Sequence, residues 1–194
     1  MFSVCLCLRY QAKRILKYLK GTTNVGLWYP SKVSLNLVCY SDSDFAGCKL
    51  VRKSTSGAYH LLGSSLISWH SKKQACVALS TKEADCIAAG SCGAQSLWIK
   101  KQLSDCGLIL YKIPLLCDNT SAINLTKNSM QHSSTKHIEI RHHFIRDHVN
   151  NGDCIIQFVA SEKQIAYLFT KPLNKERFNF LWNELGIIDF KCVN

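Results

Sequence analysis

The sequence predicts an α/β fold in which helices pack on a mixed sheet of five strands. Between residues 35 and 69, three short apolar stretches follow one another through tight connections, which is typical of an antiparallel meander. A long segment with helical spacing comes next. The remaining apolar strands then alternate with helical segments, and this order favours a mixed sheet covered by helices.

The first predicted element is a helix over residues 11–20, because its apolar residues recur three and four positions apart and Gly21 follows. The three strands of the meander are shorter and are bounded by turn residues. They are predicted at residues 35–44, 56–62 and 66–69.

Two capping boxes predict helix starts in the second half of the chain. Ser80 and Glu83 open the longest helix, which is expected to run to about Leu103. Ser161 and Gln164 form a second box, which predicts a helix over residues 165–170. The other elements follow from the same periodicities: strands at 113–117 and 154–159, and helices at 121–127, 138–149 and 175–185.

The composition favours a polyanionic partner. The 194 residues include 24 Lys plus Arg and 13 Asp plus Glu, a net charge of +11 with neutral His. Nucleic acid is the first candidate partner and an acidic membrane surface the second, while mere solubility remains the alternative. Apolar residues make up 47% of the chain, which excludes wholesale disorder. No stretch predicts a membrane span or a secretory signal, so we expect an intracellular protein, cytoplasmic or nuclear, without a membrane partner.

The eleven cysteines predict buried thiols rather than a disulfide or metal framework. Their number is odd and no C-x-x-C pair occurs. Cys39, Cys86 and Cys154 replace core residues inside apolar patterns, as free cysteines in a reducing compartment do. Three tryptophans are likewise expected in the core rather than as platforms for base stacking: Trp69, Trp98 and Trp182.

Three of the scarce carboxylates stand where the ligands of an α/β site collect. Asp42 and Asp118 end predicted strands, and Asp85 lies in the first turns of the longest helix, so the three side chains are candidates to converge. Adjacent carboxylates repel unless a cation neutralises them, and oxygen ligands favour Mg²⁺ or Mn²⁺. A pair of such ions suits in-line phosphodiester hydrolysis. The local alternatives are a turn role for Asp42 and a helix cap for Asp118.

Eight segments stand in one order along residues 11–186: Lys13–Thr22, Tyr40–Gly47, Arg52–Gly57, Ile67–Gln74, Val77–Asp85, Cys117–Ile123, Thr135–Ile140 and Phe169–Lys171. In this order they resemble the ribonuclease H domain of the Pol polyprotein of copia-type LTR retrotransposons, especially plant ones. The resemblance implies a ribonuclease H-like fold with a β-β-β-α-β-α-β-α order. It also implies endonucleolytic hydrolysis of the RNA strand of RNA/DNA hybrids by two Mg²⁺ or Mn²⁺ ions, with no small-molecule cofactor.

The same resemblance implies a division of the chain as a truncated Pol fragment. Residues 1–34 are expected to be the end of the reverse transcriptase or its connection, 35–188 the ribonuclease H-like domain, and 189–194 a tail. The reverse transcriptase part of Pol is then a possible second partner, after the RNA/DNA hybrid.

The resemblance assigns the catalytic and metal-binding roles to Asp42, Asp85 and Asp118, and two family positions are altered. Asp85 stands where the family has Glu, so its carboxylate is one methylene shorter. Tyr167 stands where the family has a fourth Asp, and a tyrosine is not an anionic ligand at neutral pH. We expect impaired cleavage with hybrid binding retained. The alternative is a catalytically inactive nucleic-acid-binding remnant of a transposon.

Basic side chains are expected to hold the phosphates of the hybrid without reading bases. The RNA strand would be distinguished by its 2′-OH. For each cation, a solvated surface position remains the alternative. The predicted phosphate-binding residues are Arg52, Lys72, Lys73, Lys136 and Arg141.

Overall fold

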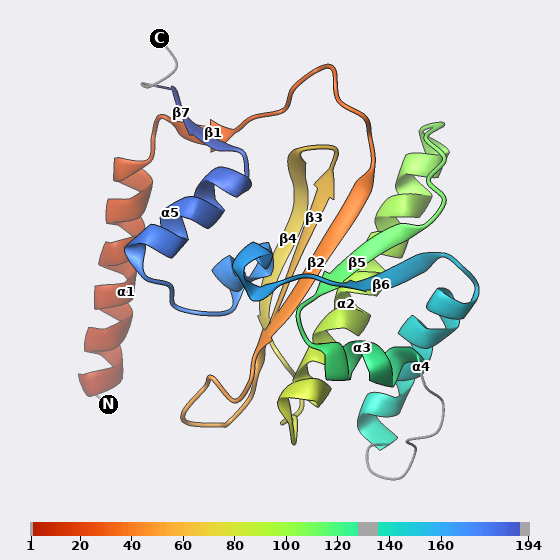
Figure 1. The fold of residues 1–194 in the computed structure, drawn as a ribbon. Coiled ribbons are helices and arrows are strands. Elements are labelled where there is room, and N and C mark those ends of the chain that lie inside the picture. The colour runs from red at the N-terminus through yellow and green to blue at the C-terminus, as the bar shows by residue number, and fades with distance from the viewer. Residues whose placement is uncertain (1, 128–135, 191–194) are drawn as a thin grey trace.

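A five-stranded mixed sheet forms the centre of the molecule (Figure 1). The computed structural model describes residues 2–127 and 136–190. The strand order is β4-β3-β2-β5-β6; β2, β3 and β4 pair antiparallel, and β5 and β6 continue the sheet in parallel. This confirms the predicted fold class. The strands are β2 (Leu37–Asp44), β3 (Thr55–Leu62), β4 (Ser65–Lys73), β5 (Ile113–Cys117) and β6 (Cys154–Phe158).

Different elements cover the two faces of the sheet. On one face α2 packs on β2 and β3, and α4 packs on α2 (Figure 1). On the other face the short 3-10 helix η2 lies on β2 and β3, with α5 behind it. The helices are α1 (Phe2–Gly21), α2 (Thr81–Asp105), α3 (Thr120–Lys127), α4 (Lys136–Asn150), η1 (Ser161–Lys163), η2 (Ile165–Phe169) and α5 (Lys175–Glu184).

Each face has its own hydrophobic core. The core under α2 is built largely from small and branched side chains, including Cys39, Cys92, Leu115 and Ile145, all completely buried. The predicted core positions Cys86 and Cys154 belong to it as well, so burial is confirmed for the three named cysteines. It does not extend to every thiol, because Cys48 and Cys76 are partly exposed and Cys106 is exposed. The core under η2 is smaller and centres on five buried residues: Tyr59, Leu66, Ile165, Leu181 and Leu185.

The tryptophan prediction is wrong for two of the three residues. Trp69 is 54% exposed on the edge strand β4, and Trp98 is 58% exposed on α2. Strand β4 has a neighbour on one side only, so part of its surface stays open to solvent. Trp182 is partly buried and its ring lies 5.3 Å from that of Phe178.

The first capping box forms as predicted. The Ser80 hydroxyl accepts a hydrogen bond of 3.2 Å from the Glu83 N–H, and a Glu83 carboxylate oxygen accepts one of 2.7 Å from the Leu79 N–H. These bonds satisfy backbone donors that have no partner inside the helix. The start of α2, which carries Asp85, is therefore fixed by local sequence.

The second capping box does not open an α-helix, and that prediction is wrong. Residues 161–169 form the two short 3-10 helices η1 and η2, with the extended residue Gln164 between them. The buried Gln164 side chain accepts from the Ala166 N–H and donates to the Ser41 carbonyl at 3.1 Å. This bond to β2 holds the segment against the sheet in place of a regular helix.

A small second sheet was not predicted. Strands β1 (Val25–Leu27) and β7 (Ile187–Asp189) pair antiparallel, so residues ahead of the main sheet lie against residues near the far end of the chain. Helix α1 extends further toward the N-terminus than the predicted 11–20. Among the described residues, no helix combines the length and apolarity that a membrane span needs.

Candidate active site

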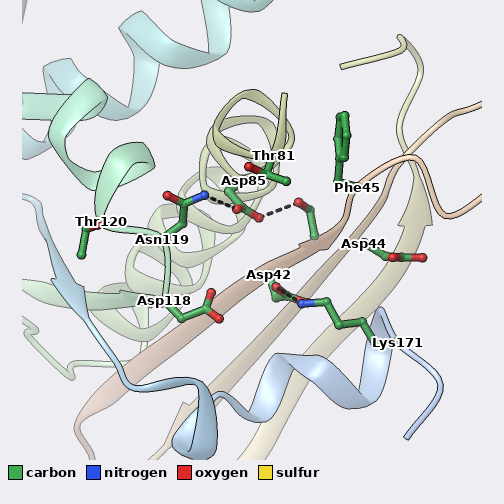
Figure 2. A pocket seen from close by; sticks show the side chains of 10 residues that line it. Asp42, Asp44, Phe45, Thr81, Asp85, Asp118, Asn119, Thr120 and Lys171 are labelled. Atoms are coloured by element: carbon green, nitrogen blue, oxygen red, sulfur yellow. Dashed lines mark hydrogen bonds and ion pairs between the residues drawn. The ribbon is translucent and has the colours of Figure 1, made fainter. Parts of the chain in front are cut away.

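A polar pocket of about 500 Å³ opens where β2 and β5 end beside the start of α2 (Figure 2). The three carboxylates predicted to converge all line it: Asp42 from β2, Asp85 from α2 and Asp118, which directly follows β5. The remaining lining comes from the loops that follow the strands and from the segment after η2. The lining residues are Asp42, Ser43, Asp44, Phe45, Thr81, Asp85, Asp118, Asn119, Thr120 and Lys171.

Strand alternation directs neighbouring residues of β2 to opposite faces of the sheet. Ser43 points to the α2 face, where its hydroxyl donates to Asp85 at 2.5 Å. Asp42 points to the η2 face, where it contacts Thr170 and Lys171. The end of β2 therefore joins the two sides of the pocket.

Asp42 is almost completely buried, with 2% of its surface exposed. The Thr170 hydroxyl donates to Oδ2, and the Lys171 ammonium lies 3.0 Å from Oδ1. Burial raises the pKa of this carboxyl to about 6, although the ammonium and the hydroxyl pull it down. Asp42 thus titrates at a higher pH than an ordinary aspartate.

Asp85 receives one hydrogen bond on each carboxylate oxygen. Ser43 donates to Oδ1, and the Asn119 side-chain amide donates to Oδ2 at 2.8 Å (Figure 2). Burial raises the pKa of Asp85, while these two hydrogen bonds lower it. The Asp85 side chain is therefore held by Ser43 at the end of β2 and by Asn119, which follows β5.

Asp118 is bound from the far side of the pocket by Tyr167. The tyrosine hydroxyl donates to Oδ2 at 2.5 Å, and the Ser161 hydroxyl donates to the same oxygen at 3.3 Å. Burial and this hydrogen bond raise the pKa of Tyr167, so its hydroxyl stays protonated. The cap of α3 is Asn119, whose Oδ1 accepts from the N–H groups of residues 121 and 122. The cap alternative for Asp118 is thus ruled out.

The three carboxylates suit a divalent metal ion in ligand type and in placement around one pocket. Carboxylate oxygens are the donors that Mg²⁺ and Mn²⁺ prefer. Five of the six oxygens, however, already accept from a protein donor. Within the described residues, no three His, Cys, Asp or Glu side chains are arranged closely enough to hold an ion. A metal would therefore have to displace hydrogen-bond partners from Asp42, Asp85 and Asp118.

Asp44 turns away from the other acids (Figure 2). One of its oxygens lies 1.6 Å from where a Cβ on Gly47 would be, so a larger residue at position 47 would displace the Asp44 side chain. Ala46 adopts a left-handed backbone with φ of 53°, and its N–H donates to the Ser54 hydroxyl. This tight turn fixes the exposed ring of Phe45 at the rim of the pocket.

Three of the predicted phosphate-binding residues lie at the same end of the sheet as the acids. Lys72 and Lys73 are exposed at the end of β4, opposite Ser56 and Thr55 of β3, and β3 in turn pairs with the acidic end of β2. Arg52 is exposed in the loop between β2 and β3. The side chains of the other two predicted residues, Lys136 and Arg141, lie outside the described residues.

Sequence reasoning missed the residues that hold the acids. Ser43 and Asn119 each stand next to a predicted site residue. Strand alternation could have predicted that Ser43 faces the opposite side of the sheet from Asp42. Lys171 and Thr170 belong to the segment Phe169–Lys171, which was noted for its resemblance but given no role. Their contacts with Asp42 bridge distant parts of the chain, and no local pattern predicts such contacts.

Comparison with known proteins identifies the chain's relatives. It is 38% identical over 175 residues to the retrovirus-related Pol polyprotein from transposon TNT 1-94 of Nicotiana tabacum, an alignment that covers 90% of this chain and 13% of the relative. The chain is a homologue of plant retrotransposon Pol. It spans about an eighth of the length of the Pol polyproteins it matches. No family model matches.

Solved structures identify the fold of this Pol homologue as that of ribonuclease H. The N-terminal ribonuclease H domain of rv2228c from Mycobacterium tuberculosis superposes with a TM-score of 0.52 at 8% identity, covering 77% of this chain and 98% of that domain. The LC11 ribonuclease H1, crystallised in complex with an RNA/DNA hybrid, superposes with a TM-score of 0.50 at 9% identity, covering 70% and 94%. At such identities the likeness concerns the fold alone, and it confirms the ribonuclease H-like prediction.

Proposed function

We propose that this Pol homologue binds RNA/DNA hybrids and hydrolyses the RNA strand with impaired efficiency. One observation carries the proposal: in a ribonuclease H fold, carboxylates from β2, α2 and β5 line a single pocket. The Pol homology supports the same function.

The residues that would hold divalent ions are Asp42, Asp85 and Asp118. When bound, such ions supply an activated water and stabilise the leaving oxygen of the phosphodiester. The impairment follows from two residues of this chain. Tyr167 places a neutral hydroxyl against Asp118 where the family has a carboxylate. The Asp85 side chain is one methylene shorter than the family's Glu. Displacements of about 1 Å can lower rates ~100-fold in preorganised sites.

The proposed substrate is an RNA/DNA hybrid because the LC11 enzyme of the same fold was crystallised with one. The exposed cations Arg52, Lys72 and Lys73 would contact its phosphates from the end of the sheet that carries the acids. Such contacts position the backbone without reading sequence. The 2′-OH marks the RNA strand as the one to be cut.

The deciding experiment restores both altered positions. Purified wild-type chain and the double variant Asp85→Glu, Tyr167→Asp are incubated with an end-labelled RNA/DNA hybrid in Mg²⁺. We expect the double variant to cleave the RNA strand about 100-fold faster or more. A triple variant that adds Asp42→Asn serves as the control and should lose the gain. If the double variant cleaves the hybrid and the wild type cleaves it at the same rate, the impairment is refuted.

A second candidate function is hybrid binding without cleavage. The donors on all three carboxylates favour it, because they leave the acids partnered by the protein itself. Under this alternative the restored double variant stays inactive while hybrid binding persists. Binding should weaken with salt, and replacing Lys72 and Lys73 by Gln should reduce the slope of log K against log salt by about 2. Absence of salt-dependent hybrid binding would contradict both functions.

A further inference from the structure

A lysine side chain, Lys171, places its positive charge in the pocket. The Lys171 ammonium lies 3.0 Å from Oδ1 of Asp42 and 3.7 Å from the centre of the Tyr167 ring (Figure 2 shows the ion pair). The first contact is a charged hydrogen bond to an almost completely buried carboxylate. The second is a cation–π contact. Lys171 is thus held from two sides.

The backbone fixes this arrangement. The Tyr167 carbonyl accepts hydrogen bonds from the N–H groups of Thr170 and Lys171, at 3.2 and 3.0 Å. The turn that these bonds close places the Tyr167 ring and the Lys171 side chain together. The Thr170 hydroxyl donates to the second oxygen of Asp42, so residues 170 and 171 occupy both oxygens of that carboxylate.

A divalent ion at this carboxylate would meet the ammonium directly. Asp42 is one of the three acids placed to hold such an ion, and Oδ1 cannot bind Lys171 and a metal at full strength together. Two cations within a few ångströms repel, and little solvent lies between groups at a buried carboxylate to screen the repulsion.

We propose that Lys171 is a built-in counter-cation that competes with divalent metal ions for Asp42, and that the Tyr167 ring holds it in place. The substitution at position 167 then acts twice. It replaces the carboxylate that the family has at the metal site, and its aromatic ring contacts the competing Lys171 ammonium. This inference rests on the proposed function only for the identity of the metal-binding acids.

Direct metal binding tests the inference without nucleic acid. Mn²⁺ is titrated into the protein at pH 8, above the pKa of Asp42, and free Mn²⁺ is followed by electron paramagnetic resonance. We expect Lys171→Met to bind Mn²⁺ about tenfold more tightly than the wild type. The matched control is Lys163→Met, which removes the same charge from an exposed position of η1. It should bind Mn²⁺ like the wild type.

Variants at Tyr167 separate the ring from the hydroxyl. Tyr167→Phe and Tyr167→Leu both remove the hydroxyl that donates to Asp118, but only Tyr167→Leu also removes the ring under the ammonium. Tyr167→Leu should therefore bind Mn²⁺ severalfold more tightly than Tyr167→Phe. Lys171→Arg keeps the charge and should retain weak binding. Circular dichroism verifies that each variant is folded. Unchanged or weaker Mn²⁺ binding in a folded Lys171→Met protein would overturn the inference.

The outcome is separable from that of the cleavage assay. Tighter Mn²⁺ binding in Lys171→Met supports the competition even where no variant cleaves a hybrid. Conversely, active cleavage by the restored double variant together with unchanged Mn²⁺ binding in Lys171→Met supports the proposed function and rejects the competition.

Discussion

The two faces of the sheet differ in how they are built and in what they bring to the pocket. The face under α2 has the larger core and regular elements, and it contributes Asp85 through a well-capped helix. The face under η2 has the smaller core and two 3-10 turns, and it contributes Tyr167, Thr170 and Lys171. The regular face presents Asp85, whereas the irregular face presents one ammonium and two hydroxyls that bind Asp42 and Asp118.

The face under α2 therefore provides the regular framework of the pocket, and the face under η2 provides the contacts that affect the charge of its acids. Short 3-10 turns leave much of the backbone without helical hydrogen bonds, so side chains such as Gln164 hold the segment to the sheet. The contacts that hold Asp42 and Asp118 therefore depend on a few long-range hydrogen bonds. Four predictions test how far the two faces are independent.

The largest effect is expected in the core under α2. Leu115 is completely buried in β5, and Leu115→Ala should lower the free energy of unfolding by about 2–5 kcal/mol. Leu181→Ala removes an equally buried leucine from the core under η2 and should fall at the low end of that range, because the smaller cluster can collapse around the gap. Urea unfolding measures both variants. A larger loss in Leu181→Ala would reverse the ranking of the two cores.

The next effect is the pH dependence contributed by Asp42. Its pKa of about 6 in the folded state exceeds the ordinary value of 3.8, so the folded state binds the proton more tightly. The stability that this group contributes therefore falls as pH rises from about 4 to about 6, by about 3 kcal/mol. Relative to Asp42→Asn, the wild type should lose stability across this window. A difference between the two proteins that does not vary with pH would contradict the role of burial.

A third prediction concerns the contact between β3 and η2. Gly57 stands directly opposite Asp42, and a Cβ there would lie 2.6 Å from a methyl carbon of Thr170 and 3.1 Å from the Ala166 carbonyl oxygen. Gly57→Ala should cost about 1–3 kcal/mol through overpacking. Gly21→Ala, where no atom lies within 4 Å, is the matched control and should not destabilise the protein. Thermal unfolding measures the stability of the two variants. An equal loss of stability in both would contradict the close contact between Gly57 and the η2 segment.

The smallest effect is expected at Asn119, which serves the regular face. Asn119→Ala removes the cap of α3 and one hydrogen bond to Asp85, and should cost about 1 kcal/mol. Ser161→Ala removes one 3.3 Å hydrogen bond to Asp118 at an exposed site and should stay within about 0.5 kcal/mol. Urea unfolding of both variants provides the measurement. A greater loss at Ser161 would show that η1 stabilises the domain more than the α3 cap.

Sequence patterns predicted the regular face well because its signals are local. Alternation located β2 and β3, and the bond between Ser80 and Glu83 located the start of α2. Three of the four pocket acids, Asp42, Asp85 and Asp118, were predicted because each stands near the end or start of such an element.

The irregular face could not be predicted because its contacts are distant in sequence. Gln164 looks like part of a capping box, yet its partner is the Ser41 carbonyl, 123 positions earlier. From the sequence alone, Lys171 is expected to be an ordinary surface cation, because only the folded chain brings it next to Asp42 of β2. Strands β1 and β7 have three residues each, too few to show a period of two.

The pairing of β1 with β7 has a consequence for how this domain sits in a longer chain. The Trp28 N–H donates to the Gly186 carbonyl and the Trp28 carbonyl accepts from Ser65, so the paired strands lie beside the β3–β4 turn, at the end of the sheet away from Asp42. The strand pair therefore brings Val25–Leu27 and Ile187–Asp189 together at one end of the domain, and no residue of α1, β1 or β7 lines the pocket. A longer chain that continues beyond Asp189 would leave the domain at this end, away from the mouth of the pocket.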